Sequence, residues 1–85
     1  METMTPIKAM VVGAGSAGAI VVHELLTTNK ITYTPVCIVD DDEIKLHNTI
    51  EGVEVVGSTR EIPRIADEYG VEEILIAIPS APKSQ

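Results

Sequence analysis

The chain has 85 residues, enough for one small domain with a modest core. Its 13 acidic and six basic residues give a net charge of -7. A surface of that charge repels phosphate backbones and anionic bilayers, so we expect no nucleic-acid partner and no direct membrane contact by this segment. Apolar residues make up 45% of the chain, nearly all of them Ile, Val, Leu and Ala, a composition typical of a buried parallel sheet.

The first half of the chain predicts a strand, a helix and a second strand. Residues 7–13 are an apolar run typical of a buried strand, and residues 16–28 carry apolar side chains at helical spacing. Residues 33–40 predict the second strand, with Pro35 near its start, where a strand tolerates proline. Residues 41–49 are polar and predict a loop.

The second half predicts a short strand, a helix and a last strand. Residues 51–57 form a short apolar segment bracketed by glycines. Ser58 and Glu61 fit a capping box, and Gly70 is placed to end the helix that follows. The predicted apolar face of this helix consists of Ile62, Ile65, Ala66 and Tyr69. Residues 73–78 predict the last strand.

This order predicts an α/β, Rossmann-like fold with a parallel three-to-four-stranded sheet flanked by helices. The first strand is expected in the middle, with the second and then the short strand on one side and the last strand on the other. We expect residues 7–80 to form one incomplete domain, with 1–6 a disordered tail and 81–85 a tail or a truncated continuation. The last strand is expected to be buried on both faces, which carry Ile74, Ile76 and Ile78 on one side and Leu75 and Ala77 on the other.

Two features of the first half point to a nucleotide site. Residues 13–18 (GAGSAG) match the pattern G-x-G-x-x-G. In that pattern Gly13 makes the tight turn, Gly15 lets a pyrophosphate approach the backbone, and Gly18 lets the helix pack closely on the strand. The helix N-terminus attracts phosphate, and Ser16 can add a hydroxyl. The alternative is that the glycines only form a tight turn around an empty site.

An acid at the end of the second strand completes the pattern. Asp40 follows Gly18 by about 20 residues, the place from which an acid accepts hydrogen bonds from a ribose. An acid there favours NAD over NADP, because a 2′-phosphate needs an arginine nearby and none occurs before Arg60. Ser80, after the last strand, either lines the nucleotide crevice or begins the tail.

The remaining polar residues predict no catalytic centre and no metal site. The acidic run 40–43 lies along a strand end, where neighbouring side chains diverge, so it predicts a solvated turn. His23 is expected on the surface of the first helix and His47 in the polar loop. No Tyr-x-x-x-Lys pair of the short-chain dehydrogenase type occurs.

Two further observations concern the location of the protein. Residues 1–6 lack the basic start and apolar core of a signal peptide, and no apolar run approaches the roughly 20 residues of a membrane helix. Cys37 has no disulfide partner and no metal-ligand spacing, so we expect it to be a buried apolar residue in a reducing compartment. These features favour the cytoplasm.

Four segments together resemble a known family. VVGAGSAG, CIVDDD, IEGVEVVGS and EILIAIPS, in this order and spacing, resemble the N-terminal Rossmann-like domain of membrane-anchored nucleoside-diphosphate-sugar 4,6-dehydratases/epimerases of capsule and other polysaccharide biosynthesis. The resemblance implies a nucleotide cofactor held at Gly13, Gly15, Gly18 and Asp40, with Ser80 a weaker match. It also implies a position at the cytoplasmic face of the inner membrane, with the catalytic domain outside this chain.

The ligand and the assembly remain open at this point. NAD is the expected cofactor, with CoA or another nucleotide as the alternative. A non-catalytic CoA- or NAD-sensing regulatory module fits the same glycine pattern. We expect a homo-oligomer, because the last strand leaves an apolar edge uncovered.

Overall fold

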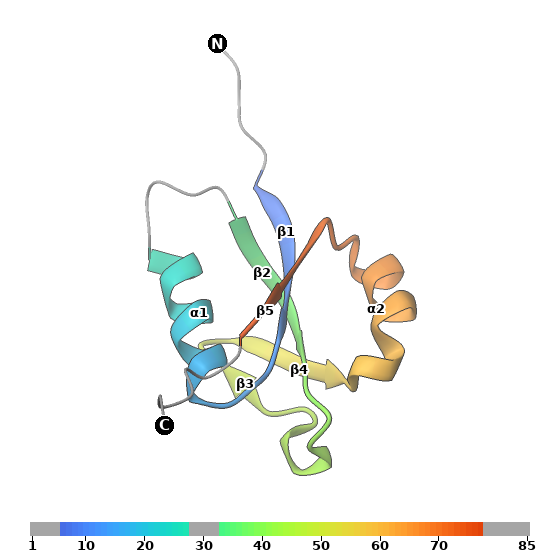
Figure 1. Cartoon of the computed structure of the whole chain (residues 1–85). Helices are drawn as coiled ribbons and strands as arrows, with labels where there is room; N and C mark the ends of the chain where they lie inside the picture. The colour runs from blue at the N-terminus through green and yellow to red at the C-terminus, as the bar shows by residue number, and fades with distance from the viewer. Residues whose placement is uncertain (1–5, 28–32, 78–85) are drawn as a thin grey trace, which may run out of the picture.

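The computed structural model of the protein describes residues 6–27 and 33–77. Its strands are β1 (Ile7–Val12), β2 (Tyr33–Val39), β3 (Thr49–Ile50), β4 (Val53–Gly57) and β5 (Glu73–Ile76). Its helices are α1 (Ser16–Thr27) and α2 (Ile62–Tyr69), with short 3₁₀ turns η1 (Glu43–Lys45) and η2 (Thr59–Glu61). The sheet lies between the two α-helices, with α1 on one face and α2 on the other (Figure 1).

The strand order confirms the predicted α/β, Rossmann-like arrangement. The sheet runs β3-β4-β2-β1-β5, so β1 lies in the middle and β5 lies on the side away from β2. The pairs β1–β2, β1–β5 and β2–β4 are parallel, whereas β3 pairs with β4 in the antiparallel sense. The polypeptide therefore reverses its direction of winding between β1 and β5, and open α/β sheets bind ligands at the carboxyl end of such a point.

The β3–β4 hairpin is a difference from the prediction. The short strand expected at residues 51–57 begins at Val53, because Glu51 and Gly52 form the turn of the hairpin. Both turn residues have positive φ, 49° and 87°, as a two-residue turn of this kind requires. Because β3 has only two residues, it is too short to show the alternation of apolar and polar side chains by which a strand is predicted from sequence.

Two apolar clusters fill the faces of the sheet. The cluster between the sheet and α1 contains Val11, Val22 and Ile38, and the cluster on the α2 side contains Met10 and Ile65. Met10 and Val11 are neighbours on β1 and are both fully buried, on opposite faces. Burial on both faces is the reason why the sequence is continuously apolar from Ala9 to Val12, after the exposed Lys8.

Pro35 occupies a bulge in β2. Ala9 and Met10 of β1 pair with Pro35 and Cys37, so Val36 is the extra residue of the bulged strand. Proline has no N–H to give to a ladder, and sheets accept it at such irregularities. The expectation that the strand tolerates Pro35 is confirmed.

The second α-helix forms much as predicted. Both the N–H and the hydroxyl of Ser58 donate to the Glu61 carboxylate, at 3.4 and 3.3 Å, which confirms the predicted pairing of these residues. The chain first makes the turn η2 and then continues as α2, which ends at Gly70 as expected. Of the predicted apolar face, Ile65 is fully buried, whereas Tyr69 is 39% exposed. Neither helix of residues 6–27 and 33–77 is long and apolar enough to cross a membrane.

The predicted burial of the last strand is wrong for the part that the structure describes. Ile74 is 43% exposed and Ile76 is 65% exposed, whereas Leu75 is half-buried. These side chains are exposed because β5 is an edge strand, which pairs with β1 alone in the described sheet. Ala77 packs against the α1-side cluster, and Ile78 lies outside the described residues.

Candidate functional site

The glycine turn joins the carboxyl end of β1 to the start of α1. Gly13 has φ 114°, a conformation that side chains rarely adopt, and its N–H donates to the Val39 carbonyl at 2.8 Å. A Cβ on Gly13 would also lie 2.9 Å from the Ala77 carbonyl oxygen. The tight turn predicted for Gly13 is confirmed, and the turn is fixed between β2 and the end of β5.

Gly18 lies where the helix touches the turn. A Cβ on Gly18 would lie only 1.8 Å from the carbonyl oxygen of Gly13. This is a contact between two backbone segments, so no side chain can rotate away to relieve it. The predicted role of Gly18 in close packing is confirmed.

Gly15 differs from both of these glycines. It is exposed, and the nearest atom to a Cβ placed on it would be Nζ of Lys45 at 3.8 Å, an ordinary contact distance. Its carbonyl accepts the N–H of Ala19 at 2.9 Å, so Gly15 precedes the first helical turn, and Ser16 beside it is exposed. The N–H groups of a first turn have no partner within the helix. The fold therefore does not require a glycine at position 15, and the backbone there is open to a ligand.

Asp40 joins two loops at the carboxyl edge of the sheet. Its Oδ2 accepts the N–H of Ala14 at 2.7 Å, and its Oδ1 accepts the N–H of Asp42 at 2.8 Å. These hydrogen bonds from Asp42 and Ala14, together with the positive charge of Lys45, lower the pKa of the Asp40 carboxyl. The sequence places Asp40 at the strand end correctly, but its bond to the glycine turn is a contact that spacing alone does not reveal.

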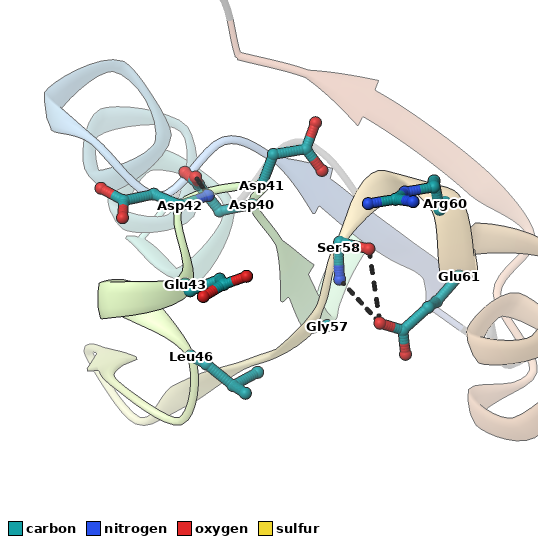
Figure 2. A pocket seen from close by; sticks show the side chains of 9 residues that line it. All are labelled: Asp40, Asp41, Asp42, Glu43, Leu46, Gly57, Ser58, Arg60 and Glu61. Carbon is teal, nitrogen blue, oxygen red and sulfur yellow. Dashed lines mark hydrogen bonds between the residues drawn. The ribbon is translucent and has the colours of Figure 1, made fainter.

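The acidic residues after Asp40 diverge, as predicted. Asp41 accepts the N–H and the hydroxyl of Thr59 at 2.8 and 2.9 Å, and hydrogen bonds from Thr59 lower its pKa. Asp42 accepts the N–H of Ile44 at 3.1 Å and so begins η1. Figure 2 shows the three aspartate side chains pointing in different directions. Within residues 6–27 and 33–77, no three His, Cys, Asp or Glu side chains are arranged to hold a metal ion.

An open pocket of about 810 Å³ lies beside Asp40, between η1 and the start of η2. Glu43 and Leu46 line one side, and Arg60 and Glu61 line the other (Figure 2). The remaining lining residues are Asp40, Asp41, Asp42, Gly57 and Ser58. The pocket lies at the ends of β2 and β4, and no residue of the glycine turn lines it. Asp40 is the link between the two, because it lines the pocket and also accepts the N–H of Ala14.

Two cations near the site were not expected from the sequence. Arg60 follows Asp40 by many residues, yet it lines the same pocket, because β4 brings the chain back beside β2. Lys45 reaches the glycine turn from η1. Neither residue belongs to a recognisable motif. Their position follows only from the parallel pairing of β2 and β4, which brings the segments after these two strands to the same edge of the sheet.

The other residues considered from the sequence lie elsewhere. His23 is exposed on α1, as expected, and contacts Glu51 at 2.8 Å, while the exposed His47 contacts Glu54 at 2.8 Å. Cys37 is fully buried, also as expected, and burial raises the pKa of its thiol to about 11. Ser80 lies outside the described residues.

The site combines a buried parallel strand, a glycine turn, a helix N-terminus and an acid on the next strand. This combination defines a Rossmann-like, nucleotide-binding class of domain. The comparisons agree with this class. The chain belongs to the CoA-binding domain family, which its residues 3–85 match.

Curated relatives come from polysaccharide biosynthesis. The chain is 39% identical over 72 residues to the capsular polysaccharide biosynthesis protein CapD of Staphylococcus aureus. It is 36% identical over 73 residues to the probable polysaccharide biosynthesis protein EpsC of Bacillus subtilis (strain 168). These matches cover 84% and 86% of this chain but 12% of each relative, so the chain spans about an eighth of their length.

Solved structures show the same fold. A UDP-D-quinovosamine 4-dehydrogenase from Vibrio fischeri has a TM-score of 0.78 at 27% identity, over 92% of this chain and 62% of that one. The Rex-family repressor RSP in complex with β-NADH has a TM-score of 0.73 at 17% identity, over 91% of this chain and 36% of that one. The second likeness shows the fold alone. The predicted resemblance to the Rossmann-like domain of polysaccharide-biosynthesis enzymes is confirmed.

Proposed function

We propose that this chain binds NAD, as the nucleotide-binding domain of an enzyme that modifies nucleotide sugars for a surface polysaccharide. The pyrophosphate lies over Gly13–Gly18, at the N-terminus of α1 with the Ser16 hydroxyl nearby, and the adenosine ribose lies at Asp40. The domain holds the nucleotide, and the chemistry on the sugar belongs to other parts of the whole enzyme. The names of CapD and EpsC and the dehydrogenase likeness support the sugar-modifying context.

The open backbone at Gly15 is the observation that carries this proposal. Gly13 and Gly18 are both required by contacts within the fold, so their presence says little about a ligand. Gly15 is free of such contacts, and it lies at the end of a helix whose free N–H groups and partial positive charge attract phosphate. A ligand that approaches the backbone closely is a physical reason for a residue without a side chain at this position.

Asp40 retains room for a ribose. An ionised carboxylate has about four lone-pair sites, and the two backbone N–H groups that Asp40 accepts use two of them. The two sites that remain are enough for the two hydroxyls of a ribose. The pocket of about 810 Å³ beside Asp40 is of the size that ligand sites have, and we assign the adenine to it.

The test is calorimetric titration of the purified chain with NAD, NADP and CoA. We expect NAD to bind most tightly, because the pocket beside Asp40 is lined by five carboxylates and one arginine, Arg60, and this excess of negative charge repels an additional phosphate. Replacing Gly15 by valine is expected to abolish binding while thermal unfolding stays close to that of the wild type. Equal NAD affinity in wild type and Gly15→Val would place the phosphates elsewhere.

CoA is the second candidate, favoured by the family to which the chain belongs. CoA carries a phosphate on its ribose, and Arg60 in the pocket is the group able to pair with it. If CoA is the ligand, it binds more tightly than NAD, and Arg60→Met removes that preference, whereas Lys8→Met, at the far end of β1, leaves it unchanged. A nucleotide-sensing regulatory module has the support of the fold alone, because the repressor is 17% identical.

A further inference from the structure

Lys45 places a positive charge beside the open glycine of the turn. It is the last residue of η1 and is half-buried. Its Nζ lies 3.8 Å from the position that a Cβ of Gly15 would occupy. The ammonium group therefore faces the same space that the missing side chain leaves open.

Hydrogen bonds fix the loop that carries this lysine. The N–H of Lys45 donates to the Asp42 carbonyl at 3.0 Å, and its carbonyl accepts the N–H of Asn48 at 3.0 Å. Asp42 in turn donates its N–H to Asp40, whose other carboxylate oxygen accepts the N–H of Ala14 in the glycine turn. One carboxylate thus connects the glycine turn to the loop, and it sets the distance between Lys45 and the turn.

A bound diphosphate needs such a cation in this protein. The chain has a net charge of -7, and the acidic run 40–43 lies next to the proposed phosphate position. A helix N-terminus supplies only about half an elementary charge. Among the cations that the structure describes, Lys45 alone lies within 4 Å of the Cβ position of Gly15. Lys8 approaches Gly70 at the opposite end of β1, Arg64 pairs with Glu61 and Glu68, and Arg60 lines the pocket beside Asp40.

We propose that Lys45 contacts the diphosphate of the bound nucleotide, with the loop 41–48 as the outer wall of the phosphate site. This inference rests on the proposed function, because it names a further binding residue of the same site. Lysine binds phosphate as a compact point charge, and its flexible stem lets the ammonium follow the oxygens. The glycine turn then supplies N–H groups to the diphosphate, and Lys45 supplies the positive charge that compensates it.

The experiment compares ADP with adenosine, which lacks the phosphates, by titration of ¹⁵N-labelled protein followed by NMR. Lys45→Met is expected to weaken ADP binding by about ten- to a hundredfold, the scale of a hydrogen bond to a charged group. Adenosine affinity is expected to stay the same, because adenosine does not reach the lysine. Lys45→Arg keeps the charge and is expected to restore most of the ADP affinity. Lys8→Met removes the same charge at the far end of β1 and serves as the control.

The outcomes separate this inference from the proposed function. If the wild type binds neither ADP nor NAD, the proposed function fails and the inference fails with it. If the wild type binds ADP and Lys45→Met binds it equally well, the proposed function stands and the role of Lys45 is wrong. If Lys45→Met weakens ADP and adenosine by the same factor, the lysine acts on the loop or the adenosine pocket, and the diphosphate contact is also wrong.

Discussion

The glycine turn gives a direct test of which residue serves the fold and which serves a ligand. Replacing Gly18 by alanine puts a carbon 1.8 Å from the Gly13 carbonyl oxygen. A favourable carbon–oxygen contact is about 3.3 Å, so the two backbones must separate by roughly 1.5 Å. Overpacking of this kind costs about 1–3 kcal/mol, and a contact between two backbone segments belongs at the upper end of that range.

The loss is large for so small a domain. At about 0.05–0.15 kcal/mol per residue, the whole chain has a free energy of unfolding of roughly 4–13 kcal/mol. A loss of about 3 kcal/mol lowers Tm by roughly 12–24 °C, since 1 kcal/mol corresponds to about 4–8 °C in a domain of this size. Gly18→Ala is therefore expected to unfold far below the wild type.

Gly15→Ala is the matched control, because the same chemical change meets open space there. Its Cβ lies at ordinary contact distance from the flexible end of Lys45. Alanine is a poorer residue than glycine before a helix, but it reduces the entropy of the unfolded chain, so the net change is expected to stay within about 1 kcal/mol.

The measurement is thermal and urea unfolding followed by circular dichroism, without nucleotide. A Gly18→Ala protein that melts within about 4 °C of the wild type would show that α1 does not pack on the turn as described. Equal losses in the two variants would make Gly15 a fold residue and would remove the structural reason for a phosphate at that position.

Three further outcomes are expected. Hydrogen bonds from two backbone N–H groups lower the pKa of Asp40 below its ordinary value of 3.8, so the stability they provide is present above that pH and is lost as the pH falls through the folded-state pKa. The free energy of unfolding, measured in urea from pH 7 to pH 2, should fall less on acidification in Asp40→Asn than in the wild type. Parallel curves for the two proteins would contradict this. Cys37 is buried with a thiol pKa raised to about 11, so a thiol reagent at pH 8 should label native protein far more slowly than protein in urea; equal rates would mean that β2 is open. The apolar edge at β5 should make the chain dimerise at micromolar concentration in light scattering, with Ile76→Lys monomeric. Ile44, which is away from the edge and more exposed than Ile76, is the control, and Ile44→Lys should still be dimeric; a monomeric wild type would refute this.

The elements that the sequence predicts correctly share one property, which is a local signal strong enough to stand alone. The middle of β1 (residues 9–11) and the end of β2 (residues 37–39) are buried on both faces and so appear as continuous apolar stretches. Ser58 and Glu61 bond to each other across a single turn, and Gly70 ends α2 with a φ of 66°. Each of these features depends on residues within a few positions along the chain.

The features that the sequence misses depend on contacts between distant segments. β3 exists only because the turn at Glu51 and Gly52 folds two residues back on β4. Lys45 and Arg60 reach the site because the ends of β2 and β4 meet at one edge of the sheet. The apolar pattern of β5 is real, but burial requires neighbouring elements, and the described part of the chain covers only one of its edges.

Asp40 shows why a motif can give the correct position and an incomplete role. Spacing from the glycines identifies it as a ribose acceptor, yet in the structure its two oxygens already accept N–H groups from the glycine turn and from the loop that carries Lys45. Removing the carboxylate would therefore release both loops, and a loss of nucleotide affinity in Asp40→Ala would not distinguish a lost ribose contact from a displaced phosphate site. Gly15 and Lys45 are the more informative positions, because substitutions there test the proposed contact with the nucleotide while the hydrogen bonds that Asp40 accepts from Ala14 and Asp42 stay in place.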